Sequence, residues 1–225
     1  MALNIYYTKE SHIGRWAFLI GTVALLIISG WLTYRWYSTG EVPSVPFLAA
    51  SAKTGVNKSN VTPAQLKAYT VPDNNPRYIG IPALQVDKTR VFPVKVDSNN
   101  QLEIPKNIND VGWYEKSSTP GSGGVILVDG HSAGSSLDGA LAHLKTLQVG
   151  LEIVIERGDG KLFTYKVVEN KSIPIEEANT TGMKIMSQAA EADKEGLNII
   201  AADGKWVPRL GTFDRRIMLR AVIVE

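Results

Sequence analysis

Cysteine is absent from the chain, and no other gap in its composition excludes as much chemistry. Without thiols the 225 residues form neither disulfides nor thiolate metal sites, and the sequence as written holds no cysteine nucleophile. A charge excess of one sign is also lacking, because residues 38–225 carry 21 basic and 21 acidic side chains. That balance gives no general case for nucleic-acid binding. What remains is a globular composition, 44% hydrophobic and 20% charged.

One long apolar run lies near the N-terminus. Residues 16–34 read WAFLIGTVALLIISGWLTY, which is 19 residues without a charge and with aromatic side chains at its ends. This length is enough to cross a hydrocarbon core of about 30 Å, with the aromatic rings at headgroup level. A buried globular helix and a removable signal peptide are the alternatives, but the candidate cleavage site Ala50-Ser51-Ala52 lies too far beyond the run. We therefore expect a single-pass membrane anchor over residues 16–37.

The flanking sequence predicts how the chain is arranged about this anchor. Lys9 and Arg15 precede the run, whereas after Arg35 the next basic residue is Lys53. The positive-inside rule therefore favours a cytoplasmic N-terminus over residues 1–15. Residues 38–61 are rich in Ser, Thr, Pro, Asn and Gly, which is typical of an extracellular stalk. A folded extracellular domain is expected over residues 62–225.

Short strands dominate the predicted domain. Apolar and polar side chains alternate in residues 151–156 and 162–168, and the sequence RGDGK between them predicts a hairpin. Further strands are expected at residues 77–84, 89–96, 124–129, 197–202 and 215–225. Thr62, Pro63 and Gln65 predict a capped short helix through about Ala68. Helical periodicity is otherwise limited to residues 137–147 and 176–190. The pattern is that of an all-β barrel or sandwich with short helices.

The sequence GHSAG offers one catalytic hypothesis, with Ser132 as the nucleophile of a G-x-S-x-G elbow. Such a hydrolase needs an acid and then a histidine downstream of the serine, on a sheet of alternating parallel strands and helices. His143 is the one later histidine, and it falls inside a predicted helix close to the serine. The C-terminal third predicts hairpins instead of βαβ units. The serine-hydrolase reading therefore stays a minor alternative.

His131 in the same sequence offers a second hypothesis. An imidazole at the end of an interior strand, between Gly130 and Gly134, is held on rigid structure and is open to a substrate backbone, as a general acid/base requires. In FDRRIMLRAV, Arg216 points away from the face that bears Ile217, so its guanidinium can donate to a carbonyl or oxyanion. A surface histidine and a solvated arginine are the alternatives.

The order of these features resembles one known family. A transmembrane anchor, a stalk, a strand ending in GHS, then LNIIAADG and FDRRIMLRAV are similar to the sortases, membrane-anchored cysteine transpeptidases of the bacterial cell surface. DVGWY (residues 110–114) and PGSGG (residues 120–124) fit the same order, so the resemblance covers roughly residues 61–225. It implies a closed β-barrel domain.

The resemblance also implies roles for individual residues. The sortase histidine follows a strand in GH[ST], which corresponds to His131, and the arginine of the last strand corresponds to Arg216. The family pattern L-T-[LI]-x-T-C matches LNIIAA, which puts Ala202 at the position of the nucleophilic cysteine and Ala201 where threonine is usual. Arg215 has the opposite parity and is the weaker candidate. The remaining candidate substrate-binding residues, beside Ala201, are Ser132, Asp203 and Trp206.

In the family, the cysteine cleaves a C-terminal LPXTG-like sorting signal between Thr and Gly and passes the acyl group to an amine of a peptidoglycan precursor or a pilin lysine. A methyl group at position 202 can perform neither nucleophilic nor acid/base chemistry, so the chain as written is expected to be inactive. An engineered Cys→Ala change is one explanation, favoured because His131 and Arg216 remain. A natural pseudo-sortase that binds peptides is the other. Neither a cofactor nor a metal is implied.

Overall fold

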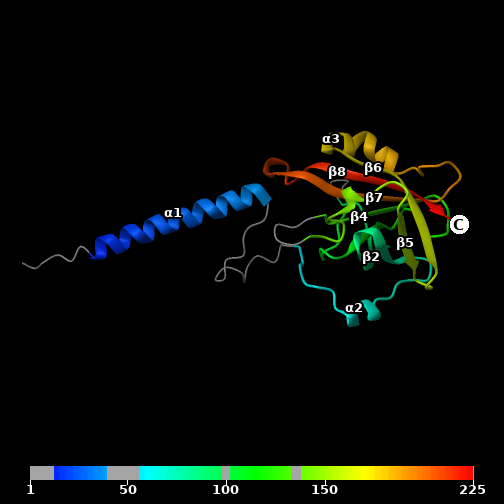
Figure 1. Ribbon diagram of the computed structural model, residues 1–225, viewed down its shortest axis with the longest axis horizontal. Coiled ribbons are helices and arrows are strands. Elements are labelled where there is room, and N and C mark those ends of the chain that lie inside the picture. The colour runs from blue at the N-terminus through cyan, green and yellow to red at the C-terminus, as the bar shows by residue number, and fades with distance from the viewer. Residues whose placement is uncertain (1–12, 40–55, 98–101, 133–137, 225) are drawn as a thin grey trace, which may run out of the picture.

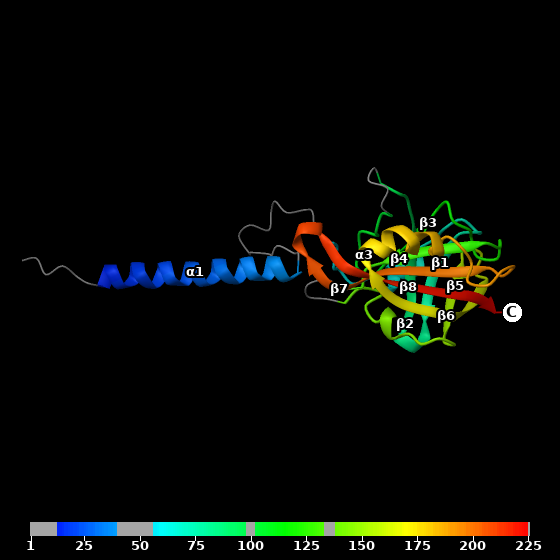
Figure 2. The same ribbon diagram turned by 90° about the horizontal axis from the view of Figure 1, so that it is seen from above.

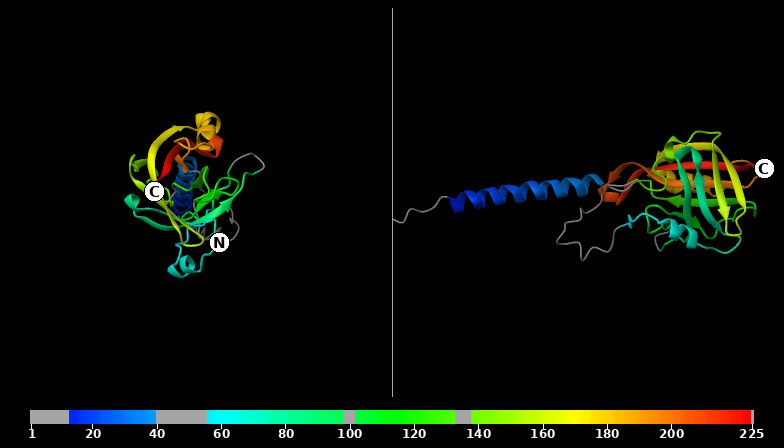
Figure 3. Two further views of the ribbon diagram at one scale, coloured as in Figure 1. Left: turned by 90° about the vertical axis from the view of Figure 1, so that its right-hand side faces the viewer. Right: turned by 60° about the horizontal axis from the view of Figure 1, so that its bottom comes forward.

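Eight strands form a closed barrel in the computed structural model, which describes residues 13–39, 56–97, 102–132 and 138–224 (Figures 1 and 3). The order around the barrel is β1-β2-β3-β4-β7-β8-β6-β5. The strands are β1 (Pro76–Ile81), β2 (Val86–Val94), β3 (Val111–Tyr114), β4 (Val125–Gly130), β5 (Glu152–Arg157), β6 (Leu162–Pro174), β7 (Gly196–Val207) and β8 (Thr212–Val224). The predicted all-β barrel with short helices is confirmed.

A helix of 27 residues, α1 (Ile13–Thr39), precedes the barrel and projects from it as a rod (Figure 2). Within the described residues it is the one helix long and apolar enough to cross a membrane, and none of that stretch is buried. Its apolar side chains therefore lack the protein contacts that a core helix would make. This is consistent with single-pass membrane anchoring.

Residues 56–75, which precede β1, contact the barrel from their first residues on. The backbone N–H of Asn57 donates to Lys106 O at 2.8 Å, and Ile108 N–H donates to Asn57 O at 2.9 Å. Helix α2 (Pro63–Ala68) follows with the predicted cap, in which Thr62 and Gln65 exchange hydrogen bonds. The chain thus contacts the domain before residue 62, the predicted start of the folded domain.

The barrel interior is filled by every second residue of the strands, as period-2 alternation requires. In β4, β7 and β8 these inward side chains are almost completely buried, each at most 2% exposed. They are Ile126, Val128, Leu197, Ile199, Ala201, Ile217, Leu219 and Ala221. The intervening residues of the same strands point outward, and we call the surface they form the outer face.

Strand register arranges the outer face into rows. Strands β4 and β7 are parallel, and β7 and β8 are antiparallel. The rows are counted from the end of the barrel at which β4 ends. The second row contains Asp129, Ile200 and Met218, and the third row contains Leu127, Asn198 and Arg220. Three short helical segments, α3 (Ile175–Glu177), η3 (Ala178–Gly182) and α4 (Met183–Met186), connect β6 to β7, and their Ala178 and Met186 pack on Leu127 and Met218.

Two helix predictions need correction. Residues 138–147 form turns and a single 3-10 turn, η2 (Leu144–Thr146), instead of the expected helix. Their three-residue apolar spacing arises because Leu141, Leu144 and Leu147 close one end of the barrel. Asn170 Nδ2 donates there to the carbonyl oxygens of Leu144 and Leu147. The helical stretch expected at residues 176–190 ends at Met186. Part of the first prediction, residue 137, lies outside the described residues.

Candidate functional site

Three of the predicted site residues lie in one row at the end of the barrel. Ala202 on β7 is paired directly with Arg216 on β8. Gly130, the last residue of β4, is paired with Ala201, so the next residue, His131, lies at the level of Ala202. We call His131, Ala202 and Arg216 the first row of the outer face. Residues distant in the sequence therefore converge through strand register.

The imidazole of His131 is half-buried and fixed through one nitrogen. Its Nε2 lies 2.8 Å from the carbonyl oxygen of Pro105, in the β2–β3 connection. A carbonyl oxygen only accepts, so Nε2–H is the donor, and in the neutral ring the lone pair is on Nδ1. The backbone of His131 is held as well, because its carbonyl accepts from Leu141 N–H at 2.9 Å. Proton transfer by this histidine therefore falls to Nδ1.

Gly139 permits this close packing around His131. A Cβ atom at position 139 would lie 2.2 Å from the carbonyl oxygen of His131, which is far inside van der Waals contact. Any side chain at this position would therefore push the histidine backbone out of its place.

The guanidinium of Arg216 is oriented by its own end of the β7–β8 hairpin. One terminal nitrogen donates to the carbonyls of Phe213 and Arg215 at 3.1 and 2.9 Å, and the other donates to Thr212 Oγ1 at 2.6 Å. Burial lowers the pKa of this guanidinium, and within the described residues it forms no ion pair. Its positive charge is therefore not neutralised by the protein, and an oxyanion beside Ala202 would complement it.

Arg215 faces the other way, as its parity predicts. Its Nε donates to Ser172 Oγ at 2.8 Å, and it is paired with Asp203. Burial alone would raise the pKa of the Asp203 carboxyl, but hydrogen bonds from Ser172 and from Lys145 outweigh burial and lower it. The partners of Asp203 are therefore protein side chains.

The other predicted substrate-binding residues do not line the first row together. Ala201 is 2% exposed and its methyl group packs in the barrel core, on the opposite side of β7 from Ala202. Ser132 is buried, and its carbonyl accepts from Gly139 N–H at 3.2 Å. Trp206 stacks edge-on against Phe213 with ring centroids 5.5 Å apart, farther along the hairpin. The side chain of Ala201 therefore packs in the core and does not reach the outer face.

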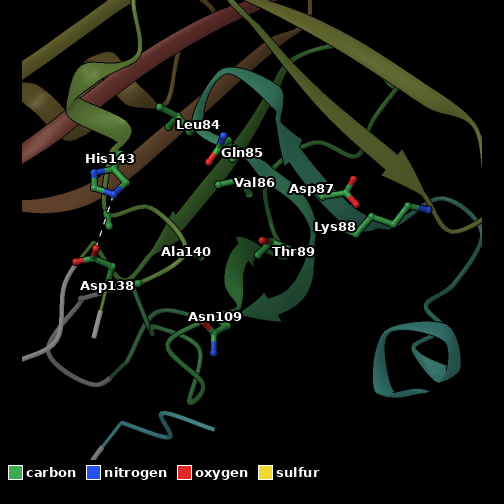
Figure 4. A pocket seen from close by; sticks show the side chains of 12 residues that line it. Leu84, Gln85, Val86, Asp87, Lys88, Thr89, Asn109, Asp138, Ala140 and His143 are labelled. Carbon is green, nitrogen blue, oxygen red and sulfur yellow. Dashed lines mark ion pairs between the residues drawn. The ribbon is translucent and has the colours of Figure 1, made fainter. Parts of the chain in front are cut away.

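The barrel does not provide what a serine hydrolase built on Ser132 would need. Its sheet is closed and mostly antiparallel, without helices alternating between parallel strands. His143 is largely exposed and pairs with Asp138, with Nε2 and Oδ2 3.7 Å apart (Figure 4).

A surface groove of about 330 Å³ lies beside that pair, on the β2 side of the barrel (Figure 4). It runs between the start of β2 and residues 138–143, and its lining includes none of the predicted site residues. Within the part of the chain that the structure describes, no group of three or more His, Asp or Glu side chains is placed to hold a metal ion.

Two site features were missed by the sequence analysis. Asp129, on the outer face two residues before His131, is 6% exposed. A charged residue inside the apolar strand VILVDG was a visible signal for it. Pro105 carries no such signal, because its contact with His131 depends on the path of the β2–β3 connection.

Comparisons with known proteins identify the family of the barrel domain. The family model described as "Sortase domain" matches residues 79–223, so the chain belongs to the sortase family. A structure of sortase A from Corynebacterium diphtheriae, a lid mutant, is similar at a TM-score of 0.50 with 18% identity, over 72% of this chain and 76% of that one. Comparison with curated protein sequences gives no match.

Two further solved structures are similar. Sortase C-1 from Actinomyces oris has a TM-score of 0.48 and 17% identity, over 66% of this chain and 72% of that one. The Clostridium perfringens sortase D5 transpeptidase has a TM-score of 0.47 and 16% identity, over 74% and 91%. At these identities the likeness concerns the fold alone.

Proposed function

We propose that this member of the sortase family has the site of a cysteine transpeptidase in which Ala202 occupies the position of the nucleophile. The observation that supports this most is the first row, where Ala202 lies between a strand-end histidine and an arginine that forms no ion pair with the carboxylates the structure describes. Nucleophile, acid/base and oxyanion donor must reach one carbonyl, and this row gives all three positions on one face.

The proposed substrate is a sorting-signal peptide of the LPXTG type. With a cysteine at position 202, Nδ1 of His131 takes the thiol proton, the resulting thiolate attacks the carbonyl carbon of Thr, and Arg216 stabilises the oxyanion. The C–N bond to Gly then breaks, and His131 gives its proton to the departing amine through Nδ1. The same atom accepts a proton from the incoming amine, which attacks the thioester and releases the thiolate. The acceptor is a peptidoglycan precursor or a pilin lysine.

The chain as written is proposed to bind such a peptide without cleaving it. The methyl group of Ala202 removes the nucleophile and leaves the outer face in place. The test is Ala202→Cys in the full chain, assayed for thiol-dependent peptide cleavage and for transfer to an added amine. We expect activity to appear only in the cysteine protein. Turnover by the unmodified chain would show that position 202 is not the nucleophile.

Arg215 and Arg216 provide a matched pair within this experiment. In the Ala202→Cys protein, Arg216→Ala should lower kcat/KM by about 10²- to 10³-fold, because it removes the oxyanion donor. Arg215→Ala changes the opposite side of the same strand and should affect kcat/KM much less. Equal losses would contradict the assignment of Arg216.

A natural peptide-binding module is the second candidate, favoured by the alanine itself. It predicts that Ala202→Cys binds sorting peptides but remains inert against several motifs despite an intact fold. The codon at position 202 in the parent gene, cysteine or alanine, separates an engineered change from a natural one.

We further propose that α1 anchors the chain in the cell membrane with residues 1–15 in the cytoplasm and the barrel outside. The apolar, unburied surface of α1 supports this. Protease applied to intact cells should remove the barrel, and a fully protected barrel would contradict the orientation.

A further inference from the structure

The second row of the outer face contains one polar side chain among apolar ones. Asp129 is paired with Gly112 on β3 and with Ile200 on β7, which is paired in turn with Met218. Side chains two residues apart on a strand are separated by about 6.6 Å. Asp129 therefore lies one row behind the position where the scissile carbonyl would be held.

The carboxyl of Asp129 is buried, and it accepts a hydrogen bond from its own backbone N–H, but one of its two oxygens has no partner among the described residues. The residue is 6% exposed, and its Oδ1 has no hydrogen-bond acceptor or donor among the residues that the structure describes. Burial raises the pKa of this carboxyl well above its ordinary value. A buried polar group without a partner lowers stability, and a structural role does not account for it.

The protein makes space for this side chain. A Cβ atom at Gly112 would lie 2.4 Å from Asp129 Oδ1 and 2.9 Å from Val94 Cγ1. The glycine therefore leaves a notch into which the carboxyl fits, against the apolar side chain of Val94.

Residues 102–105 of the β2–β3 connection lie close to the same rows. Leu102 packs on the apolar cluster that contains Leu127 and Ile200, in the third and second rows. Pro105 reaches the first row, where its carbonyl accepts from His131. A substrate peptide that engages Nδ1 of His131 therefore runs alongside this segment.

We propose that Asp129 is a specificity-determining residue that accepts a hydrogen bond from a polar side chain of the sorting peptide, within three residues upstream of the scissile bond. The acyl part of the peptide stays bound after the amine leaves, so it lies over the second row, whereas the leaving part exits at the rim. The third row is covered by the connection from β6 to β7. The preferred peptides carry a hydroxyl or amide side chain there instead of an aliphatic one. This inference rests on the proposed function.

The test measures peptide binding to the unmodified full chain, which has no nucleophile at position 202 with which to cleave the peptide. The probes are sorting peptides that differ at one upstream position by a near-isosteric pair, Thr against Val or Asn against Leu. At one position the polar member should bind about tenfold more tightly, the gain of one hydrogen bond to a buried partner. Asp129→Leu should abolish this preference, and Asp129→Asn, which can still hydrogen-bond, should retain most of it.

Asp110 provides the matched control. Asp110 is as deeply buried as Asp129, but Arg90 donates to both of its carboxylate oxygens at 2.9 and 2.8 Å. Asp129→Leu should raise the melting temperature because it removes an unpaired polar group, whereas Asp110→Leu should lower it and leave the peptide preference unchanged. A lower melting temperature in Asp129→Leu would assign a structural role and overturn the proposal.

The Ala202→Cys background separates the two ways of failing. If that protein cleaves sorting peptides and Asp129→Leu keeps the same preference in kcat/KM, the assignment of Asp129 is wrong and the proposed function stands. If no peptide is bound or cleaved in either background, the proposed function and the role of Asp129 are both overturned.

Discussion

The two faces of β4, β7 and β8 differ in the kind of side chain that they bury. Inward side chains of these strands are aliphatic and at most 2% exposed, and they pack as one cluster. On the outer face lie the first row and three buried polar atoms without a partner among the described residues. These atoms are Asp129 Oδ1, Asn198 Oδ1 and Arg220 Nε.

This difference shows how one set of strands serves two purposes. Apolar burial on the inner face stabilises the barrel, by about 25 cal/mol per Å² removed from water. The outer face keeps polar atoms that burial makes costly, which is common at functional sites and rare elsewhere. Strands optimised on one face can therefore tolerate unfavourable groups on the other.

Two neighbouring isoleucines on β7 provide the most direct test of the difference between the two faces. Ile199 is 0% exposed in the barrel core, whereas Ile200 is only partly buried on the outer face. Ile199→Ala should lower the free energy of unfolding by about 2–5 kcal/mol, through lost burial and a cavity. Ile200→Ala should cost less than half of that and weaken sorting-peptide binding. Urea denaturation and peptide titration measure the two effects.

Equal losses of stability in the two alanine proteins would remove the distinction between the faces. Weaker peptide binding in Ile199→Ala alone, with Ile200→Ala unaffected, would place the peptide elsewhere on the barrel.

A smaller effect should appear in the pH dependence of stability. The pKa of Asp129 is raised by burial in the folded chain, so the folded state binds more protons than the unfolded state above about pH 4. Its contribution to stability is therefore complete below pH 4 and is lost as the pH rises towards the folded pKa. Asp129→Asn should gain stability relative to the unmodified chain between pH 4 and 7, measured by denaturation at each pH. A constant difference would show that Asp129 does not titrate as proposed.

Asp159, in the β5–β6 turn, should give a pH dependence of stability that has the opposite sign. Its hydrogen bond from Arg157 lowers the pKa to about 2. The stability it contributes is present above about pH 4 and is lost as the pH falls towards 2. Because the turn is open to solvent, Asp159→Asn should show the smallest change of the series. The same denaturation series measures it, and a deficit that grows as the pH falls would contradict the sign.

Local sequence patterns predict most of the strands because alternation and turn residues are local signals, but β3 (Val111–Tyr114) was not predicted. The cap formed by Thr62 and Gln65 and the hairpin around Gly160 are examples. The expected helix at residues 137–147 was wrong in its described part, because the spacing of Leu141, Leu144 and Leu147 fits a helix and equally fits turns that close a barrel end.

The candidate site is only partly predictable for a related reason. GHS at a strand end and the parity of Arg216 are visible in the sequence, but the pairing of Ala202 with Arg216 depends on register between separate strands. The contact between Pro105 and His131 depends on a loop whose path has no sequence period. The place of Asp129 could be foreseen from parity, whereas its missing partner could not.

The two ends of the barrel differ in the features that they carry. The chain from α1 joins the barrel beside Lys106, at the end that carries the first row, whereas the β5–β6 turn lies at the other end, where Gly158 N–H donates to Asn75 O. At about 3.3 Å per residue, β8 spans roughly 26 Å between Arg216 and Val224. Gly160 in that turn has open space around it. A fluorophore or an affinity handle inserted there would report on the barrel, or hold it to a support, with the reactive end left free.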